Sequence, residues 1–132
     1  MADTVTSQTI FDGERLAVMK FTDVSDGTGE SAVLKVDVST LTVNALGQTC
    51  TGVVIERIDV SINGMSVNIL WDANTDVSCF VAAPGVYSFD FCKLLLTNNA
   101  GTGKTGDIRF TTIGASSNDT YSIILWMVKS YT

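Results

Sequence analysis

The feature that most constrains this chain is its last apolar stretch, Thr120 to Lys129, which reads TYSIILWMVK. Successive side chains of a strand point to opposite faces, so this stretch presents two separate faces. Both are apolar, with Tyr121, Ile123, Leu125 and Met127 on one face and Ile124, Trp126 and Val128 on the other. A strand of this kind has to be covered on both sides, by a second sheet or by a neighbouring subunit. The sequence therefore predicts a layered all-β fold that assembles with other chains.

Two turns predict how the strands pair in the middle and at the end of the chain. The polar segment Gly114–Asp119 separates the last strand from residues 107–113, and we expect these two strands to form a closing hairpin. Asn63-Gly64 is the strongest hairpin signal in the sequence, since both residues accept a positive φ. We expect this turn to pair the preceding strand with residues 65–72.

The rest of the chain predicts short strands rich in β-branched and aromatic residues. Before the closing pair, we expect strands at residues 4–11, 15–22, 32–39, 53–62, 65–72, 77–82 and 86–91. Turns recur about every 8–14 residues and no segment carries a helical stripe, which is typical of antiparallel sandwiches. We predict a single domain, residues 1–132, folded as an antiparallel β-sandwich, jelly-roll-like, with eight to nine strands. Residues 1–9 are the candidate for an extended N-terminal arm.

Two strands carry a more detailed prediction. Residues 32–39 alternate most clearly, and this places Lys35 and Asp37 on a face opposite the apolar side chains. Residues 53–62 do not keep one apolar phase, and a bulge or bend near Glu56 would explain the change.

The composition favours surface that is buried against other chains. Charged residues make up 17% of the sequence and hydrophobic residues 45%, against about 25% charged in a typical domain. No apolar run approaches the ~20 residues of a membrane helix, so we expect no membrane partner. A core-rich monomer is the alternative reading. The net charge is −6, and the eight basic residues form no stripe, so we expect no nucleic acid partner.

The histidine and cysteine content of the sequence limits the catalytic mechanisms and metal centres that the chain can form. The chain contains no histidine, which excludes Ser-His-Asp and Cys-His mechanisms, the zincin metalloproteases and most cupin-type metal centres. Cys50, Cys79 and Cys92 are odd in number and have no Cys-x-x-Cys spacing, so we interpret them as reduced, small apolar residues. The start, MADTVTSQTIF, lacks the pattern of a signal peptide and predicts synthesis in the cytoplasm. We expect no enzyme activity, catalytic residue, cofactor or metal.

Three patterns resemble functional motifs but have better structural explanations. Gly103-Lys104-Thr105 matches the end of a phosphate-binding loop, yet a strand pattern follows where that motif needs a helix. Residues 72–76 open like a calcium loop but lack its glycine and its glutamate, so Asx turns are the simpler reading. Four aromatic residues could form a sugar-stacking face: Trp71, Trp126, Tyr87 and Tyr131. The apolar patterns around both tryptophans favour core or interface positions, and Tyr131 is expected to be the most exposed.

Three segments resemble small virion structural proteins of tailed bacteriophages. They read ADTVTSQTIFDGERLAVMKFTDVSDGTGES, NNAGTGKTGDIRFTTIG and TYSIILWMVKSY. The chain is also similar in size and β-rich character to capsid decoration (cement) proteins. That resemblance implies an oligomer, a trimer first, that binds the major capsid protein or another virion protein and reinforces the head lattice. It assigns no role to individual residues.

The leading hypothesis is therefore a non-enzymatic structural protein of a phage virion that oligomerises on a protein lattice. Its candidate interface residues are Ile124, Trp126, Val128, Tyr131, Val5 and Ile10. Residues 2–9 are candidates to add a strand to a partner's sheet edge. The alternative is a fibre-tip or receptor-binding module that recognises host glycan, with aromatic and amide side chains gathered around Asn98, Asn99 and Trp71.

Overall fold

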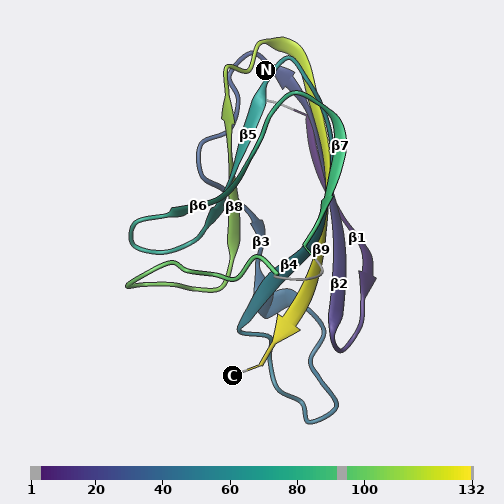
Figure 1. Cartoon of the computed structure of the whole chain (residues 1–132), viewed down its shortest axis with the longest axis vertical. Coiled ribbons are helices and arrows are strands. Elements are labelled where there is room, and N and C mark those ends of the chain that lie inside the picture. Colours follow the sequence, from purple (N-terminus) through teal and green to yellow (C-terminus); the bar gives the residue numbers. More distant parts are fainter. Residues whose placement is uncertain (1–3, 92–94, 132) are drawn as a thin grey trace.

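Two antiparallel sheets face each other in the computed structural model, which describes residues 4–91 and 95–131 (Figure 1). One sheet has the strand order β1-β2-β9-β4-β7 and the other β3-β8-β5-β6. The strands are β1 (Thr4–Asp12), β2 (Leu16–Asp26), β3 (Val33–Val36), β4 (Gly52–Asn63), β5 (Ser66–Trp71), β6 (Val77–Ala82), β7 (Gly85–Asp90), β8 (Ile108–Ile113) and β9 (Ser117–Ser130). A single 3-10 turn, η1 (Val38–Thr40), is the one helical element of the described residues.

The strand order is that of a jelly roll. Without β1, each sheet has four strands, in the orders 2-9-4-7 and 3-8-5-6, and the chain passes repeatedly from one sheet to the other. The predicted jelly-roll-like sandwich of eight to nine antiparallel strands is confirmed. Residues 4–9 of the predicted N-terminal arm belong to β1, which pairs with β2 at the edge of the chain's own sheet. Residues 1–3 of that arm lie outside the described residues.

Strand β9 lies at the centre of the five-stranded sheet, between β2 and β4. Its inner side chains face the second sheet and are at most 2% exposed: Tyr121, Ile123, Leu125 and Met127. On the neighbouring strands, Phe21 and Val60 both lie opposite Ile123, and both are buried. The second sheet adds Trp71, Ile69 and Phe110 to the same core. The inner face predicted from the alternation of β9 is therefore confirmed.

Both predicted hairpins are wrong. Strand β9 does not pair with β8, and β4 does not pair with β5, because each of these connections crosses between the two sheets. The turn signals themselves are real: Gly64 and Gly114 have φ values of 89° and 70°. At Gly64 a Cβ would lie 2.1 Å from Oδ1 of Asp119, so the crossing also needs the small residue. A positive-φ turn reverses the chain, but it does not decide which strand the returning segment joins.

Two bulges change the faces of their strands. The bulge between Ile55 and Arg57 confirms the predicted break near Glu56, and it lets the inner face of β4 stay apolar on both sides of the break. A second register shift lies between Leu34 and Val36 in β3. It turns Lys35 inward and leaves Leu34 41% exposed, so the prediction that Lys35 faces outward is wrong.

The inward Lys35 belongs to a buried polar network. Its Nζ lies 2.6 Å from Oε2 of Glu30, and the two side chains are 2% and 5% exposed. The hydroxyl of Tyr121 donates to the other oxygen of Glu30 at 2.5 Å. The ammonium also lies 5.8 Å from the ring centroid of Phe110 and 5.9 Å from that of Tyr121. The network joins β3, β9 and the loop before β3 at one end of the sandwich.

Removal of Glu30 should destabilise the fold more than removal of an exposed charge, because it leaves the Lys35 ammonium buried without its carboxylate. We expect Glu30→Ala to lower the free energy of unfolding by about 3–5 kcal/mol, measured by urea denaturation. Lys104→Ala, on an exposed loop, is the matched control and should change it by less than about 0.5 kcal/mol. Equal effects of the two substitutions would contradict a stabilising role for the pair.

Two further carboxylates hold loops against the sandwich through hydrogen bonds and ion pairs. Asp12 accepts from the buried ammonium of Lys129 and from the backbone N–H of Thr42. Burial alone would raise the pKa of Asp12, but these hydrogen bonds outweigh it and lower the pKa. The pKa of Asp72 is lowered in the same way, because hydrogen bonds from Thr105 and Arg109 outweigh the effect of burial. The Asp72 Oδ1 to Arg109 Nε distance is 2.6 Å.

Stability should therefore fall as the solution becomes acidic. A carboxylate whose pKa is lowered on folding contributes stability above its ordinary value, here 3.8, and loses that contribution as the pH falls through the folded value. We expect the urea midpoint to decline from about pH 5 downward. Asp72→Asn should show a shallower decline than the wild type. A midpoint that stays constant from pH 6 to about pH 3 would contradict this assignment.

Candidate interaction surface

The outer face of the five-stranded sheet is apolar at its centre and uncovered by the rest of the described chain. Along β9 the burial alternates, so Ile124, Trp126 and Val128 are only half-buried while their inner neighbours are fully buried. The second sheet packs on the opposite side (Figure 1). The apolar outer side of β9 predicted from the sequence is therefore not taken up by the sandwich core.

A shallow apolar groove of about 320 Å³ lies on this face. Six side chains from β1, β2 and β9 line it: Ile10, Phe11, Leu16, Val18, Ile124 and Trp126. Ile10 and Phe11 are 56% and 52% exposed. A bulge in β1 between Thr9 and Phe11 brings both of these side chains to the groove. Gly13 leaves room for the Phe11 ring, whose Cε2 would lie 2.8 Å from a Cβ at that position.

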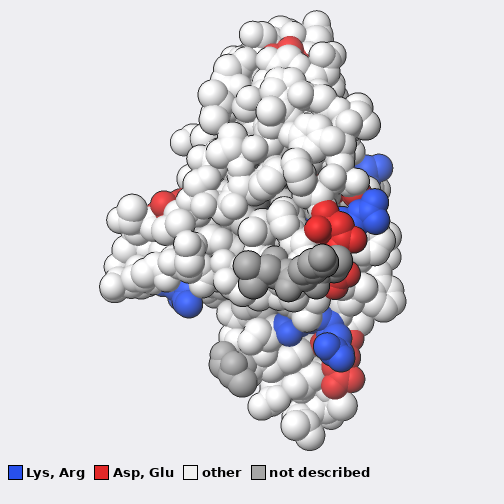
Figure 2. All heavy atoms as spheres, viewed as in Figure 1, with Lys and Arg blue, Asp and Glu red and all other residues white. Residues whose placement is uncertain are grey.

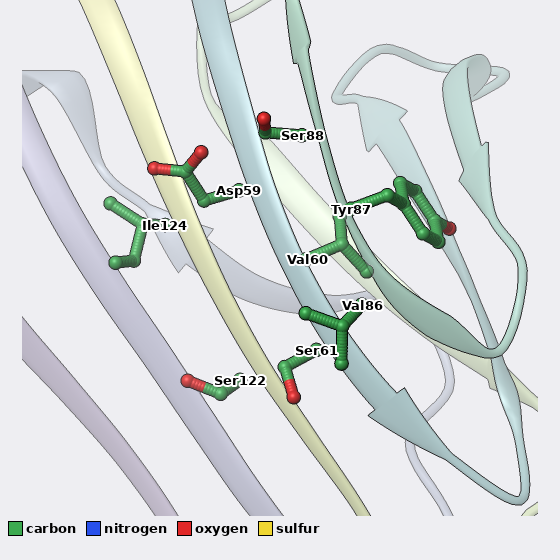
Figure 3. Close-up of a pocket in the computed structure, with 8 residues that line it drawn as sticks. All are labelled: Asp59, Val60, Ser61, Val86, Tyr87, Ser88, Ser122 and Ile124. Atoms are coloured by element: carbon green, nitrogen blue, oxygen red, sulfur yellow. The ribbon is translucent and has the colours of Figure 1, made fainter.

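A second groove, of about 400 Å³, adjoins the first across β9 and shares Ile124 with it. Figure 3 shows Ser122 and Ile124 on β9, Asp59 and Ser61 on β4, and Val86 and Ser88 on β7. This groove is more polar than the first, although Val86 at its rim is 84% exposed. Together the two grooves make one continuous surface across the sheet, which we call the outer face.

Polar contacts hold Trp126 in place on the outer face. Its Nε1 donates to Oδ2 of Asp59 at 3.0 Å, and Nε of Arg57 lies 2.9 Å from the other oxygen of Asp59. The Arg57 guanidinium lies 5.7 Å from the Trp126 ring centroid. On the other side of β9, Lys20 of β2 lies opposite Ile124. In Figure 2 the charged atoms gather along the side of the molecule where the five-stranded sheet lies.

The six candidate interface residues do not all lie on one surface. Ile10, Ile124 and Trp126 line the same groove, and Val128 lies opposite Leu16, which lines it too. The structure thus brings four of the six together. Val5 is opposite the buried Asp23 and so points to the inner side of β1, away from this group.

Tyr131 is not the exposed aromatic that we expected. It is half-buried beyond the end of β9, and its hydroxyl donates to the carbonyl oxygens of Glu14 and Thr42. The exposed aromatic residues are Phe11 on the outer face and Phe89, at 45%. Phe89 belongs to an aromatic cluster on β6, β7 and the residue after β7, with Phe80, Tyr87 and Phe91. The shared face of Tyr87, Phe89 and Phe91 follows from alternation, but their exposure does not.

The glycan-binding alternative loses one of its aromatic residues. Trp71 is 1% exposed and lies in the core, so it cannot stack on a sugar. Asn98 uses its side-chain oxygen to accept from the backbone N–H of Ala100. The surface expected around Asn98, Asn99 and Trp71 is therefore not formed.

The motif-like loops have structural roles. Lys104 is exposed, and strand β8 follows it, in place of the helix that a phosphate-binding loop needs. In the calcium-like loop, Asp76 accepts from the backbone of Ala73, and Asp72 is held by Arg109. Within the described residues, no group of three or more histidine, cysteine or acidic side chains is placed to hold a metal ion.

Cys50 and Cys79 are free thiols, and burial raises the pKa of Cys79 to about 12, so this thiol stays protonated. Cys92 lies outside the described residues. In the part of the chain that is described, no helix has the length and apolar character needed to cross a membrane.

Comparison with known proteins adds no relative. No family model matches the chain, and a search of curated proteins finds no matching sequence. The functional interpretation therefore depends on the geometry of the outer face and on the sequence itself.

Ile123 and Ile124 offer a matched pair that tests this geometry, because they are neighbours on β9 with opposite faces. We expect Ile123→Ala to lower the free energy of unfolding by about 2–5 kcal/mol, because it opens a cavity in the core. Ile124→Ala should cost about 1 kcal/mol or less at a low protein concentration, where the outer face is open to water. Denaturation of both variants at micromolar concentration measures the difference. Equal losses would mean that the outer face is buried within one chain.

Proposed function

We propose that this chain is a non-enzymatic structural protein of a bacteriophage virion, which associates with itself and binds the protein lattice of the head as a decoration (cement) protein. The observation that carries the proposal is the outer face, where an apolar groove runs from the edge strand β1 to the central strand β9 and no layer of the described chain covers it. Contiguous apolar surface of this kind marks sites of protein association.

A second apolar surface supports the lattice-binding part of the proposal. The aromatic cluster of β6 and β7 forms an edge of the sandwich, and Val81 beside it is 53% exposed. A pocket of about 380 Å³ there is lined by Phe80, Val81, Ala83, Tyr87 and Phe89. A decoration protein needs one contact with its own copies and another with the lattice beneath, and two separate apolar surfaces provide for both.

The fold is compatible with this role but does not select it. Jelly rolls occur in viral capsid proteins, in lectins and in cupins, so the architecture alone names no function. The absence of histidine from the sequence disfavours a cupin-type metal centre. A lectin-like role lacks the Trp71 surface that would support it. The resemblance of three sequence segments to phage virion proteins is what supports a place in a phage particle.

The protein content of purified virions tests the proposal. In particles of the phage that carries this gene, we expect peptide mass spectrometry to find the chain in tens of copies or more, and electron cryo-microscopy to place it on the head. Ile124→Ser in the phage gene should reduce the copies per particle, because it makes the apolar groove polar. Lys104→Ala, on an exposed loop, should leave the copy number unchanged. Virions without this chain would contradict the proposal.

A further inference from the structure

We propose that two copies of this chain pack outer face against outer face, about a two-fold axis that runs along β9. The inference rests on the self-association in the proposed function and specifies its geometry. The second copy is the occupant of the apolar groove, and the axis passes beside Ile124 and Trp126, the two outer residues of β9 that line this groove.

The argument begins with one row of side chains across the sheet. Lys20 on β2 and Asp59 on β4 both lie opposite Ile124 of β9. Because directly opposed residues of antiparallel strands share a face, all three side chains belong to the outer face. Lys20 and Asp59 therefore lie one strand spacing, about 4.8 Å, on either side of β9. The row carries a positive charge on one side of its apolar centre and a negative charge on the other.

The two ends of the row are uncharged. Gln8 of β1 lies opposite Lys20, and Ser88 of β7 lies opposite Asp59, so neither outer position adds a charge. Asp59 already contacts Arg57, but Lys20 forms no ion pair with the described residues. The β2 side of the row thus has a cation available for a partner.

Symmetry then selects the axis. A two-fold axis in the interface and along β9 exchanges the two sides of the sheet, so Lys20 of each copy faces Asp59 of the other. Ile124 meets its own counterpart at the centre. A two-fold axis across the strands would instead set Lys20 against Lys20 and Asp59 against Asp59, which is unfavourable when charges approach closely. The charge pattern therefore favours the axis along β9.

The next row fits the same arrangement. Val18 and Arg57 lie on either side of Trp126, and Phe11 follows Val18 on β1. Rotation about β9 brings Arg57 of one copy over the apolar side of the other, where Phe11 is exposed. A guanidinium interacts favourably with aromatic rings, and the guanidinium of Arg57 already lies over the Trp126 ring, 5.7 Å from its centroid. The same row thus supplies both apolar and cation–π contacts.

The area of the face is sufficient for a stable dimer. Five strands at a spacing of about 4.8 Å, over about nine residues at ~3.3 Å each, give roughly 700 Å². This is close to the ~800 Å² per partner of a standard protein–protein interface. Packed sheets align within about 30° of each other, so the rows stay near their counterparts close to the axis.

Charge reversal tests the arrangement in solution. Sedimentation equilibrium of the full-length wild type should give twice the mass of the 14.1 kDa chain. Lys20→Glu alone and Asp59→Lys alone should each weaken dimerisation at least tenfold, because like charges then meet twice in every dimer. A mixture of the two variants, and the double variant Lys20→Glu/Asp59→Lys, should each restore dimerisation to within about threefold of the wild type. Lys104→Glu, on an exposed loop, is the control and should dimerise normally.

Asp59 also holds Trp126, so a second pair protects the test against a local folding defect. Gln8→Lys and Ser88→Glu lie at the two ends of the same row and remove no contact of Trp126. Each of these variants should dimerise no more tightly than the wild type, and their mixture should dimerise more tightly than either variant alone. Circular dichroism checks the fold of every variant.

Three results would overturn the inference: a wild type that stays monomeric at millimolar concentration, a trimer, or folded charge variants whose mixture does not recover. The failures of the two proposals are distinguishable. A chain found on virions but trimeric in solution would contradict only the two-fold dimer. A chain found on virions but monomeric in solution would contradict the dimer and the self-association, and would leave the virion role standing. A dimeric chain that is absent from virions would contradict only the virion role.

Discussion

The structure depends on the position of one strand that is apolar on both faces. Strand β9 lies between the two other long strands, β2 and β4, and this gives residues 120–128 backbone pairing on both sides. Its inner side chains form the middle of the core. Its outer side chains remain half-buried, because a jelly roll has only two layers and the second layer is already on the inner side. The same strand therefore provides the fold and the candidate interface.

Buried charges define the ends of the sandwich. The ion pair of Lys35 with Glu30 lies at one end of the sandwich, and the ion pair of Lys129 with Asp12 lies where β9 meets the end of β1. Both lysine side chains are almost completely buried. Such pairs add little net stability compared with apolar residues, but the loss of one partner is costly. Among the described residues, the ion pair of the outer face is Arg57 with Asp59, whose side chains are 44% and 27% exposed and so remain in contact with solvent.

Local patterns in the sequence predict the strands and their faces well, and they predict the connections poorly. The alternation from the residue before β5 to the end of that strand places Met65, Val67, Ile69 and Trp71 on one face, and all four are buried. The phase change in β4 reveals its bulge in advance. Pairing depends on contacts between distant segments, so the turns at Gly64 and Gly114 are recognised but joined to the wrong strands. Lys35 is misplaced because one bulged residue reverses its direction without a sequence signal of its own.

The residues of the candidate interface also fall into two groups, those that a local pattern predicts and those that depend on strand pairing. Ile124, Trp126 and Val128 follow from the period of a single strand. The contributions of Phe11, Lys20 and Asp59 depend on the cross-strand register of β1, β2, β9 and β4, which no single segment contains. Phe11 also depends on the bulge that turns it outward with Ile10. Val5, an interface candidate within the predicted N-terminal arm, lies on the other side of β1.

The central claim is that Trp126 is partly exposed to water in a single chain and becomes covered when two chains meet. The chain has two tryptophans, and Trp71 is buried in the core, so acrylamide quenching of tryptophan fluorescence separates them. Across a dilution series we expect one component that is always protected and a second whose quenching decreases as the protein concentration rises. The second component should be absent from Trp126→Phe. Quenching of Trp126 that is the same at every concentration would contradict the account.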